Sequence, residues 1–376
     1  MINSTFVIAE IGTSHEGDFN KAKKLIDACK ESGADAVKFQ WVYADEILHP
    51  KTGFVKLPTG NISLYERFKT LEVPKSFFKD CLEYAHKKGL KFVCSPFGLQ
   101  SLEELLEIKP DYLKVASPEL NHFPLLKKIA EYRKLQIQKK QQPIPLILSS
   151  GVSKEEDIFN ALNIVGRENV YLLHCVTSYP APETDYNLKV LKTLKEKFNV
   201  KVGVSDHSST PLLVPVLSIS QGGCMIEKHI TLSNETSGLD DPVALNPENF
   251  GFMCHFVHQS DAVMRHYGDE KGEKEIIRQL ELNEDSKKIK KILGNGIKVL
   301  AESEKANYGR TNRSLHYMKD LKKGHKIQKG DIEILRTEKV LSPGISPVFY
   351  DEVLGKELLV DVENGSGVQK ENFFEL

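Results

Sequence analysis

The chain has 376 residues, of which 40% are apolar and 27% charged, and this composition is typical of a globular protein rather than a disordered or fibrous one. That length is too great for one ordinary compact domain, so we expect one large barrel with an appendage, or two to three domains. The net charge of −1 argues against nucleic acid or an acidic membrane surface as a partner, and no apolar run is long enough to suggest a membrane-spanning helix.

The beginning of the chain and its cysteines both indicate a cytoplasmic protein. The first 18 residues lack the basic, apolar and small-residue pattern of a secretory signal. The six cysteines are scattered and form no C-x-x-C pair, which favours reduced thiols.

Eight short β-rich runs recur through the first 230 residues. They lie at 6–12, 36–40, 91–95, 112–117, 145–150, 170–175, 200–205 and 224–229. Their nearly continuous apolar character is typical of strands buried on both faces, which pair in parallel.

Amphipathic stretches fill the gaps between these runs. The first follows Asp18, a plausible N-cap, and another opens with Ser153 and Glu156 in the spacing of a capping box. Eight strand–helix units of this kind predict an α/β fold of the (β/α)₈ TIM-barrel type. A doubly wound sheet is the alternative, but no Gly-rich phosphate fingerprint follows the first strand.

The composition divides the chain into three parts. We expect the barrel to occupy residues 1–270. Residues 271–310 are highly charged with helical spacing of Ile and Leu, and we interpret them as a solvated helical connector rather than a segment packed on the barrel. In residues 311–376 short β-like pieces alternate with Gly and Pro turns, which predicts a small separate β-rich domain.

The polar residues at the C-terminal ends of the eight strands are the candidates for an active site, because TIM-barrel enzymes act at that face. They are Glu10, His15, Glu16, Lys38, Gln40, Ser95, Lys114, Ser117, Glu119, Ser149, Ser150, His174, Thr177, Tyr179, Ser205, Asp206, His207, Glu227, Lys228 and His229.

Two histidines follow adjacent strands in this set. His207 and His229 could bind one metal ion, with water and substrate oxygens completing its shell. The alternative is a pair of hydrogen-bonded polar residues, and two histidines on one rim favour the metal. Lys228 alternates with Glu227 and His229, so its side chain is expected to point away from the pocket.

Two lysines lie inside apolar strand runs, where an unpaired charge is costly. Lys38 and Lys114 therefore indicate a cradle for a phosphorylated or carboxylated substrate. The residues alone predict metal-assisted chemistry on a small anionic substrate, and a Schiff-base aldolase using Lys114 fits equally well.

Several motifs in order resemble the sialic acid synthase (NeuB-type) family. They are "IAEIGTSHEGD", "KVASPEL", "LHCVTSYPAP", "GVSDHS" and "IEKHITL". The final domain, with "RSLHYMKDLKKGHKIQKGDI" and "GKELLVDVENG", resembles the SAF (antifreeze-like) domain of those enzymes.

The resemblance implies a transferase that forms a C–C bond between phosphoenolpyruvate and an open-chain N-acetylmannosamine-like aldose, releasing phosphate. It implies Mn²⁺ or Mg²⁺ on His207 and His229 as a Lewis acid, and it matches Glu16 to the acid/base position. The phosphoenolpyruvate positions match Lys38, Ser95, Lys114, Ser117, Ser149 and Ser205, and Thr177 is included among the substrate-binding residues. The sugar or metal positions match Asn61, Glu119, Tyr179 and Asp240, with Lys114 and Glu119 counted as catalytic.

The resemblance also implies a domain-swapped homodimer, in which an arginine of the SAF domain contacts the N-acyl group in a partner subunit's site. Arg336 is the candidate. Simpler interpretations exist for three of these residues: Glu16 as a helix cap, Asn61 as a turn former and Arg336 as a surface charge. A non-catalytic sugar-binding homologue is the non-enzyme alternative.

This chain departs from the family pattern on the sugar side. "SPE" with Pro118 stands where many members have a more flexible sequence, and Asp241 and Ala244 replace an often-seen His and Ser. The sequence therefore leaves three candidates for the aldose: N-acetylmannosamine, its 6-phosphate and a 2,4-diacetamido-trideoxy hexose.

Overall fold

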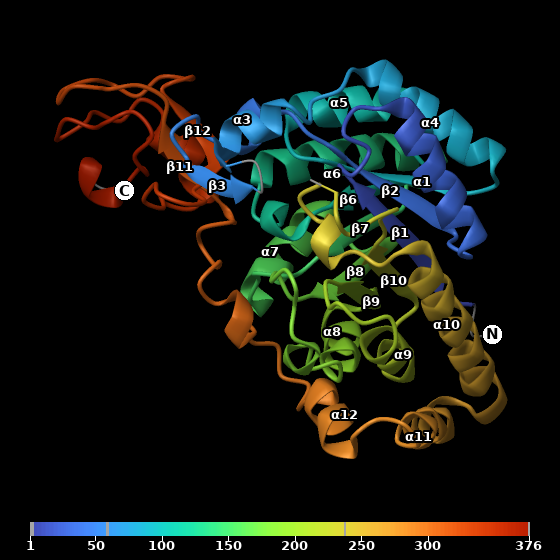
Figure 1. Ribbon diagram of the computed structural model, residues 1–376. Coiled ribbons are helices and arrows are strands. Elements are labelled where there is room, and N and C mark those ends of the chain that lie inside the picture. Colours follow the sequence, from blue (N-terminus) through green and yellow to red (C-terminus); the bar gives the residue numbers. More distant parts are fainter. Residues whose placement is uncertain (1–3, 58–59, 237, 375–376) are drawn as a thin grey trace.

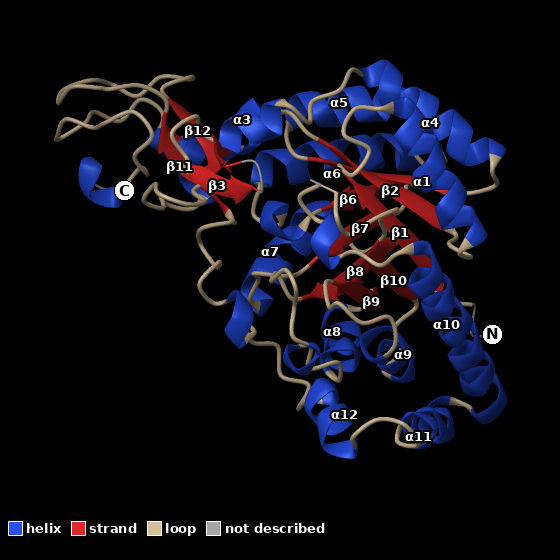
Figure 2. Ribbon diagram, in the orientation of Figure 1, coloured by secondary structure: helices blue, strands red, loops and turns tan. Residues whose placement is uncertain are grey.

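The computed structural model describes residues 4–57, 60–236 and 238–374, and Figure 1 shows a barrel with a smaller C-terminal domain at one side. The barrel is a closed sheet of eight parallel strands with helices around it (Figure 2). In barrel order the strands are β1 (Phe6–Gly12), β2 (Ala36–Trp41), β5 (Lys91–Pro96), β6 (Tyr112–Val115), β7 (Leu146–Ser149), β8 (Val170–Cys175), β9 (Lys201–Asp206) and β10 (Met225–His229). This confirms the TIM-barrel prediction and excludes the doubly wound sheet.

Amphipathic helices connect and cover the strands. They are α1 (Phe19–Glu31), α4 (Lys75–Lys87), α5 (Leu99–Ile108), α6 (Phe123–Gln138), α7 (Glu155–Val165), α8 (Val190–Phe198), α9 (Leu213–Ser220) and α10 (Pro247–Tyr267). Asp18 caps α1 as expected, because its carboxylate accepts from the amide of Asn20 at 2.7 Å. None of the described helices is long and apolar enough to cross a membrane.

An excursion of the chain separates β2 from α4. It contains α2 (Ala44–Ile47), the antiparallel hairpin of β3 (Phe54–Leu57) and β4 (Gly60–Ser63), and α3 (Leu64–Lys69). This excursion lies beside the C-terminal domain (Figure 1).

The strand alternation explains why one end of the barrel is apolar and the other is charged. Ile8, Ala36, Val93, Ile147, Leu173 and Met225 come from six different strands and form one buried apolar cluster. The residues two positions further along the same strands are Glu10, Lys38, Ser95, Ser149, Cys175 and Glu227. Because every second strand residue faces the interior, a polar layer lies directly above the apolar one, towards the C-terminal ends.

The charged segment after the barrel contains α11 (Asp269–Leu280) and α12 (Ser286–Leu293). The prediction of a solvated connector is wrong for these two helices, because their apolar sides are buried in the barrel's core. Ile276, Leu280, Ile289, Ile292 and Leu293 all belong to that core. Charged residues on the outer side masked this packing in the sequence.

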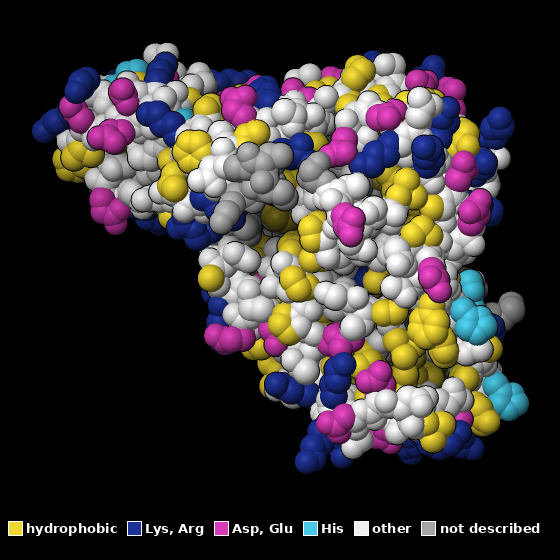
Figure 3. All heavy atoms as spheres, viewed as in Figure 1, with side chains coloured by type: hydrophobic (Ala, Val, Ile, Leu, Met, Phe, Trp, Pro, Cys, Tyr) yellow, Lys and Arg dark blue, Asp and Glu magenta, His cyan; other side chains and the backbone are white. Residues whose placement is uncertain are grey.

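The C-terminal domain has a small core of its own, around β11 (Arg313–Tyr317), β12 (Ile332–Arg336) and α13 (Tyr350–Val353). It docks on the barrel through specific bonds. The hydroxyl of Thr52 donates to the carbonyl of Thr337 at 3.0 Å. The side-chain amide of Asn121 donates to the backbone carbonyl of Arg313 at 2.8 Å. Lys/Arg and Asp/Glu side chains are interspersed over the visible face of both parts (Figure 3), in keeping with the net charge of −1.

Candidate active site

A cavity of about 240 Å³ opens at the C-terminal ends of the barrel strands. The candidate residues that line it are Lys38, Lys114, Ser117, Ser149, Thr177, Tyr179, Ser205, His207, His229, Asp240 and Arg336. A larger cleft of about 730 Å³ lies between α6, α7 and the C-terminal domain. We place the candidate site in the smaller cavity because the buried ionisable groups gather there.

Two lysines and two glutamates form the floor of this cavity. Lys38 contacts Glu10 at 2.7 Å, and Lys114 contacts both oxygens of Glu227 at 2.9 and 3.0 Å. The β9–β10 register places Ser205 opposite Glu227, and its hydroxyl donates to that carboxylate at 2.9 Å. The lysine charges are thus already paired inside the protein, which the sequence did not indicate.

The pKa values on this floor follow from burial and from the arrangement of the charges. Burial would raise the pKa of Glu227, but Lys114 and Lys38 outweigh it and hold that pKa well below its usual range. Burial dominates at Glu10, whose pKa is raised despite Lys38.

The two lysines differ for the same reasons. Burial lowers the pKa of Lys114. Repulsion by Lys38 lowers it further, and attraction to Glu227 compensates only in part. Burial acts in the same direction on Lys38, but Glu10 and Glu227 together raise its pKa. Lys114 is therefore the more easily deprotonated of the two lysines.

Unpaired hydroxyl groups lie above the floor. Among the described residues, the hydroxyls of Ser149 and Thr177 are buried without a hydrogen-bond partner, and both residues line the cavity. A buried hydroxyl without a partner is costly, so these groups are suited to bind a ligand's oxygen atoms. Ser95 has the same kind of unpaired hydroxyl but is not among the lining residues.

His207 and His229 lie side by side in the wall, with ring centroids 5.6 Å apart. Nδ1 of His207 lies 3.0 Å from the carbonyl of Val176, so Nδ1 carries a proton and Nε2 is the nitrogen that could coordinate an ion. Nε2 lies 3.2 Å from the hydroxyl of Tyr179. Burial lowers the pKa of His229 to about 4, which keeps this imidazole neutral and able to coordinate.

The donor set fits a divalent ion with an incomplete protein shell. The described residues contain no group of three or more His, Cys, Asp or Glu side chains arranged to hold an ion. Oδ2 of Asp240 lies 3.8 Å from Nδ1 of His229. Burial would lower the pKa of His207, but the Cys175 sulfur, 3.7 Å from Nδ1, contributes to raising it to about 9, so an ion there would have to displace a proton.

Lys228 lies outside the cavity, as the alternation predicts. Its ammonium group contacts Asp206 at 2.6 Å, and both side chains are buried. The carboxylate beside His207 in the sequence is therefore used by Lys228 rather than by the site.

Part of the cavity lining is apolar, and an arginine lies beside it. Phe68, Phe97, Ala116 and Leu239 line it and pack within one hydrophobic cluster. The guanidinium of Arg336, from β12, lies 5.2 Å from the ring centroid of Phe97. Arg336 thus reaches the cavity of its own chain, although a partner's cavity was expected.

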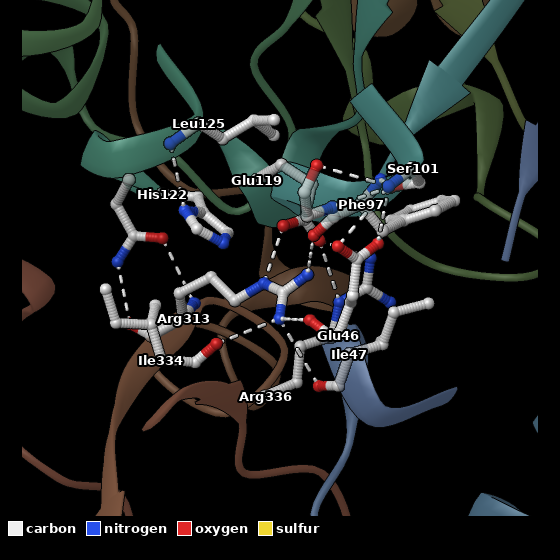
Figure 4. A network of polar contacts seen from close by, with 12 residues as sticks. Glu46, Ile47, Phe97, Ser101, Glu119, His122, Leu125, Arg313, Ile334 and Arg336 are labelled. Atoms are coloured by element: carbon white, nitrogen blue, oxygen red, sulfur yellow. Dashed lines mark hydrogen bonds and ion pairs between the residues drawn. The ribbon is translucent and has the colours of Figure 1, made fainter. Parts of the chain in front are cut away.

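The prediction that Glu119 is a catalytic residue finds no support in its position. Figure 4 shows its carboxylate held between two guanidinium groups of the C-terminal domain, and Glu119 is not among the residues that line the cavity. Arg313 donates to it at 2.5 Å and Arg336 at 2.7 Å, and the glutamate is fully buried. The short turn that contains Pro118 directs Glu119 toward the domain interface.

Two further candidates lie outside the lining of the cavity. Glu16 is on the loop after β1, where its carboxylate pairs with Lys21 at 2.8 Å. About a third of its side chain is exposed. Asn61 is exposed on β4 of the hairpin. Their predicted roles are unsupported by this geometry, because neither residue reaches the polar layer inside the barrel.

The roles assigned from the sequence do not include four residues that the structure makes prominent. Glu10, Gln40 and Glu227 line the cavity, and they stood among the strand-end residues without an assigned role. Arg313 was missed because its importance depends on contacts with three separate parts of the barrel. It donates to the carbonyls of Glu46 and Phe97 as well as to Glu119 (Figure 4).

Comparisons with known proteins agree with this architecture. A family model described as the NeuB family matches residues 25–270, and one described as the SAF domain matches residues 312–373. The N,N'-diacetyllegionaminic acid synthase of Campylobacter jejuni is 33% identical over 364 residues, covering 94% of this chain and 96% of that protein.

The chain belongs to the NeuB family. A pseudaminic acid synthase of Campylobacter jejuni is 31% identical, with 98% of this chain and 96% of that protein covered. The crystal structure of the spore coat polysaccharide biosynthesis protein SpsE of Bacillus subtilis superposes with a TM-score of 0.81 at 27% identity, covering 100% of this chain and 97% of that one. The resemblance to this family and the presence of a SAF domain are thereby confirmed.

Proposed function

We propose that this NeuB-family member condenses phosphoenolpyruvate with an N-acylated aldose, releases phosphate and requires a divalent metal ion. The observation that carries the proposal is one cavity that joins two neighbouring histidines to unpaired hydroxyls and a lysine floor. Relatives over almost the whole chain are named as acid synthases, which supports the same reaction class.

The charge of the cavity favours a metal requirement. Its lining contains three cationic side chains, Lys38, Lys114 and Arg336, and four carboxylates, Glu10, Glu227, Asp240 and Glu338. A phosphorylated carboxylate therefore meets no excess of positive charge from these residues. Mn²⁺ or Mg²⁺ on His207 and His229, completed by oxygen ligands, would supply that charge and polarise an aldehyde as a Lewis acid.

In the proposed reaction, C3 of phosphoenolpyruvate forms a bond to the aldehyde carbon, and the aldehyde oxygen takes up a proton. Water adds to C2, and the C2–O bond to phosphate breaks, which leaves a 2-keto acid. The hydroxyls of Ser149 and Thr177 donate to the bound anion, while Lys114 stays oriented by Glu227. The hydroxyl of Tyr179 and the apolar wall confine the aldose near His207.

The aldose side supports an N-acylated sugar without naming one. Arg336 presents a guanidinium beside Phe97, which suits an acyl oxygen next to an apolar group. The three candidate aldoses are N-acetylmannosamine, its 6-phosphate and a 2,4-diacetamido-trideoxy hexose. Because of the names of the Campylobacter relatives, the 2,4-diacetamido-trideoxy hexose should be tested first.

The decisive experiment follows phosphate release from phosphoenolpyruvate with Mn²⁺ and each aldose in turn. We expect release with one aldose, abolished by EDTA and restored by added Mn²⁺. His207→Ala and His229→Ala should lose the activity, whereas His258→Ala, which changes an exposed histidine of α10, should keep it. No release with any of these aldoses from folded protein would contradict the proposal.

A Schiff-base aldolase is the second candidate, because burial lowers the pKa of Lys114. Borohydride with a 2-keto acid would then attach the keto acid covalently to Lys114, and EDTA would leave the activity intact. The close pairing of Lys114 with Glu227 makes us expect no such adduct.

A further inference from the structure

The segment between α12 and β11, residues 294–312, lies against two loops of the barrel's C-terminal face. We call it the connector. Lys298 donates to the carbonyl of Ser150 at 3.1 Å, after β7, and Asn307 donates to that of Thr177 at 3.0 Å, after β8. These are the loops that follow Ser149 and carry Thr177, the residues with unpaired hydroxyls in the cavity.

Glu304 makes the central contacts of the connector. One of its oxygens accepts from the amides of Val152 and Thr177, both at 2.9 Å, and the other accepts from the amide of Ala301 at 3.1 Å. The residue is only 1% exposed. One buried carboxylate therefore joins the loop after β7 to the loop after β8, and hydrogen bonds to a charged acceptor are stronger than those between neutral groups.

The loop after β7 needs such support because its backbone is strained. Val152 has a φ of 41°, which a β-branched residue rarely adopts. A residue persists in that conformation only where its surroundings fix it. Here the amide of Val152 is bound by Glu304, and its carbonyl accepts from the side-chain amide of Asn312 at 3.0 Å.

Close packing transmits the position of this loop to the cavity. The amide of Gly151 donates to the hydroxyl of Ser117 at 3.0 Å. A Cβ atom on Gly151 would lie 2.1 Å from the hydroxyl oxygen of Thr177 and 2.9 Å from that of Ser117. A shift of Val152 would therefore displace hydroxyl groups that line the cavity.

We propose that Glu304 is a positioning residue, which sets the hydroxyl-bearing loops after β7 and β8 at the spacing that the anionic substrate requires. The connector is then part of the site's support as well as a link between domains. The expected effect of Glu304 on phosphoenolpyruvate binding rests on the proposed function, whereas its role in holding the two loops does not.

The test compares Glu304→Ala, Glu304→Gln and the matched control Glu302→Ala. Glu302 lies in the same short turn, is mostly exposed and pairs only with the neighbouring Lys305 in the described contacts. Glutamine keeps one oxygen for the two loop amides but turns an NH₂ group toward the amide of Ala301, so it should act between wild type and alanine. The readouts are amide hydrogen exchange at Val152 and Thr177, and the KM values for phosphoenolpyruvate and for the aldose.

In Glu304→Ala we expect exchange at both amides to accelerate about tenfold or more, and the KM for phosphoenolpyruvate to rise about tenfold, because two charge-assisted hydrogen bonds are lost. The KM for the aldose should change less than about threefold, and Glu302→Ala should match wild type in every readout. If Glu304→Ala does not fold, Glu304→Gln carries the same comparison with smaller shifts.

Exchange rates equal to those of Glu302→Ala would overturn the proposal. Accelerated exchange with both KM values unchanged, or raised equally, would also overturn it, because Glu304 would then be purely structural. If wild-type protein releases no phosphate with any aldose, the proposed function fails, and the exchange rates still decide whether Glu304 holds the loops.

Discussion

At the scale of single residues, the cavity floor is a set of charges that stabilise one another out of water. Lys38, Lys114, Glu10 and Glu227 are each at most 5% exposed. A buried charge that loses its partner is costly, whereas a complete pair is tolerated. Substitutions at these positions should therefore change stability as well as any activity of the cavity.

The pair of Lys114 and Glu227 gives a prediction about pH. Glu227→Gln leaves Lys114 buried without a carboxylate, which should cost about 3–5 kcal/mol of unfolding free energy at pH 7. The pKa of Glu227 is depressed in the folded protein, so the pair's contribution is complete above the ordinary value of 4.5 and is lost as the pH falls below it. Urea unfolding at pH 7 and pH 3 should show the difference from wild type shrinking at pH 3.

A matched control is Glu275→Gln, which changes a surface pair with Arg278. It should change the unfolding free energy by less than about 1 kcal/mol at both pH values. A difference between Glu227→Gln and wild type that grows on acidification would contradict the assigned direction of the pKa shift.

Gly151 gives the second residue-scale prediction. In Gly151→Ala the new methyl group would be forced against the hydroxyl of Thr177, and overpacking of this kind costs about 1–3 kcal/mol. We expect lower thermal stability together with a raised KM for phosphoenolpyruvate. Gly251→Ala in α10, where the methyl group would make only ordinary contacts, should be neutral or stabilising.

At the scale of elements, helix ends and helix faces depend on their neighbours. The capping box expected at Ser153 and Glu156 is displaced by one residue, because α7 begins at Glu155 and the amide of Lys154 donates to Asp157 at 2.8 Å. The hydroxyl of Ser153 instead donates to the carbonyl of Gly151 at 2.8 Å. The strained loop before α7 thus uses the serine that would otherwise cap the helix.

The packing of α11 on the barrel can be tested by truncation. Ile276 is 2% exposed, so Ile276→Ala should lower the unfolding free energy of the barrel by about 2–5 kcal/mol. Ile297→Ala removes the same atoms from a side chain that is 61% exposed, and it should have little effect. Equal denaturation midpoints for the two variants would show that α11 is solvated and does not pack on the barrel.

At the scale of the whole molecule, Glu119 joins the two domains. It lies between Arg313 and Arg336, and Arg313 also binds carbonyls of α2 and of the loop after β5 (Figure 4). The C-terminal domain thereby closes one wall of the cavity within a single chain. The predicted domain-swapped homodimer would form the same wall from two chains.

Mixing two inactive variants distinguishes these arrangements. We expect Arg336→Ala and His207→Ala, unfolded and refolded together, to stay inactive, because the structure seats Arg336 in its own chain's cavity. In a swapped dimer, half of the molecules formed from an equal mixture would contain one intact site, and about a quarter of the activity would return. Light scattering of wild type tests the dimer itself.

The sequence by itself determined the barrel, the order of its strands and most of the cavity's lining. These follow from local rules: buried strands are apolar throughout, helices are amphipathic, and alternation assigns each strand residue to one side of the sheet. His207, His229, Lys38 and Lys114 were identified because they stand at strand ends. The small C-terminal domain was recognised from its turns and its motifs.

Only the tertiary structure decided which charges are paired and which segments support the site. Glu119 pairs with Arg313 across 194 residues of sequence, and Glu304 binds amides 152 and 127 residues away. Periodicity and caps report on neighbours within a few turns, whereas the energy of a buried charge depends on every group that the fold brings within a few ångströms. The roles of Glu119 and of the connector therefore could not be predicted from the sequence.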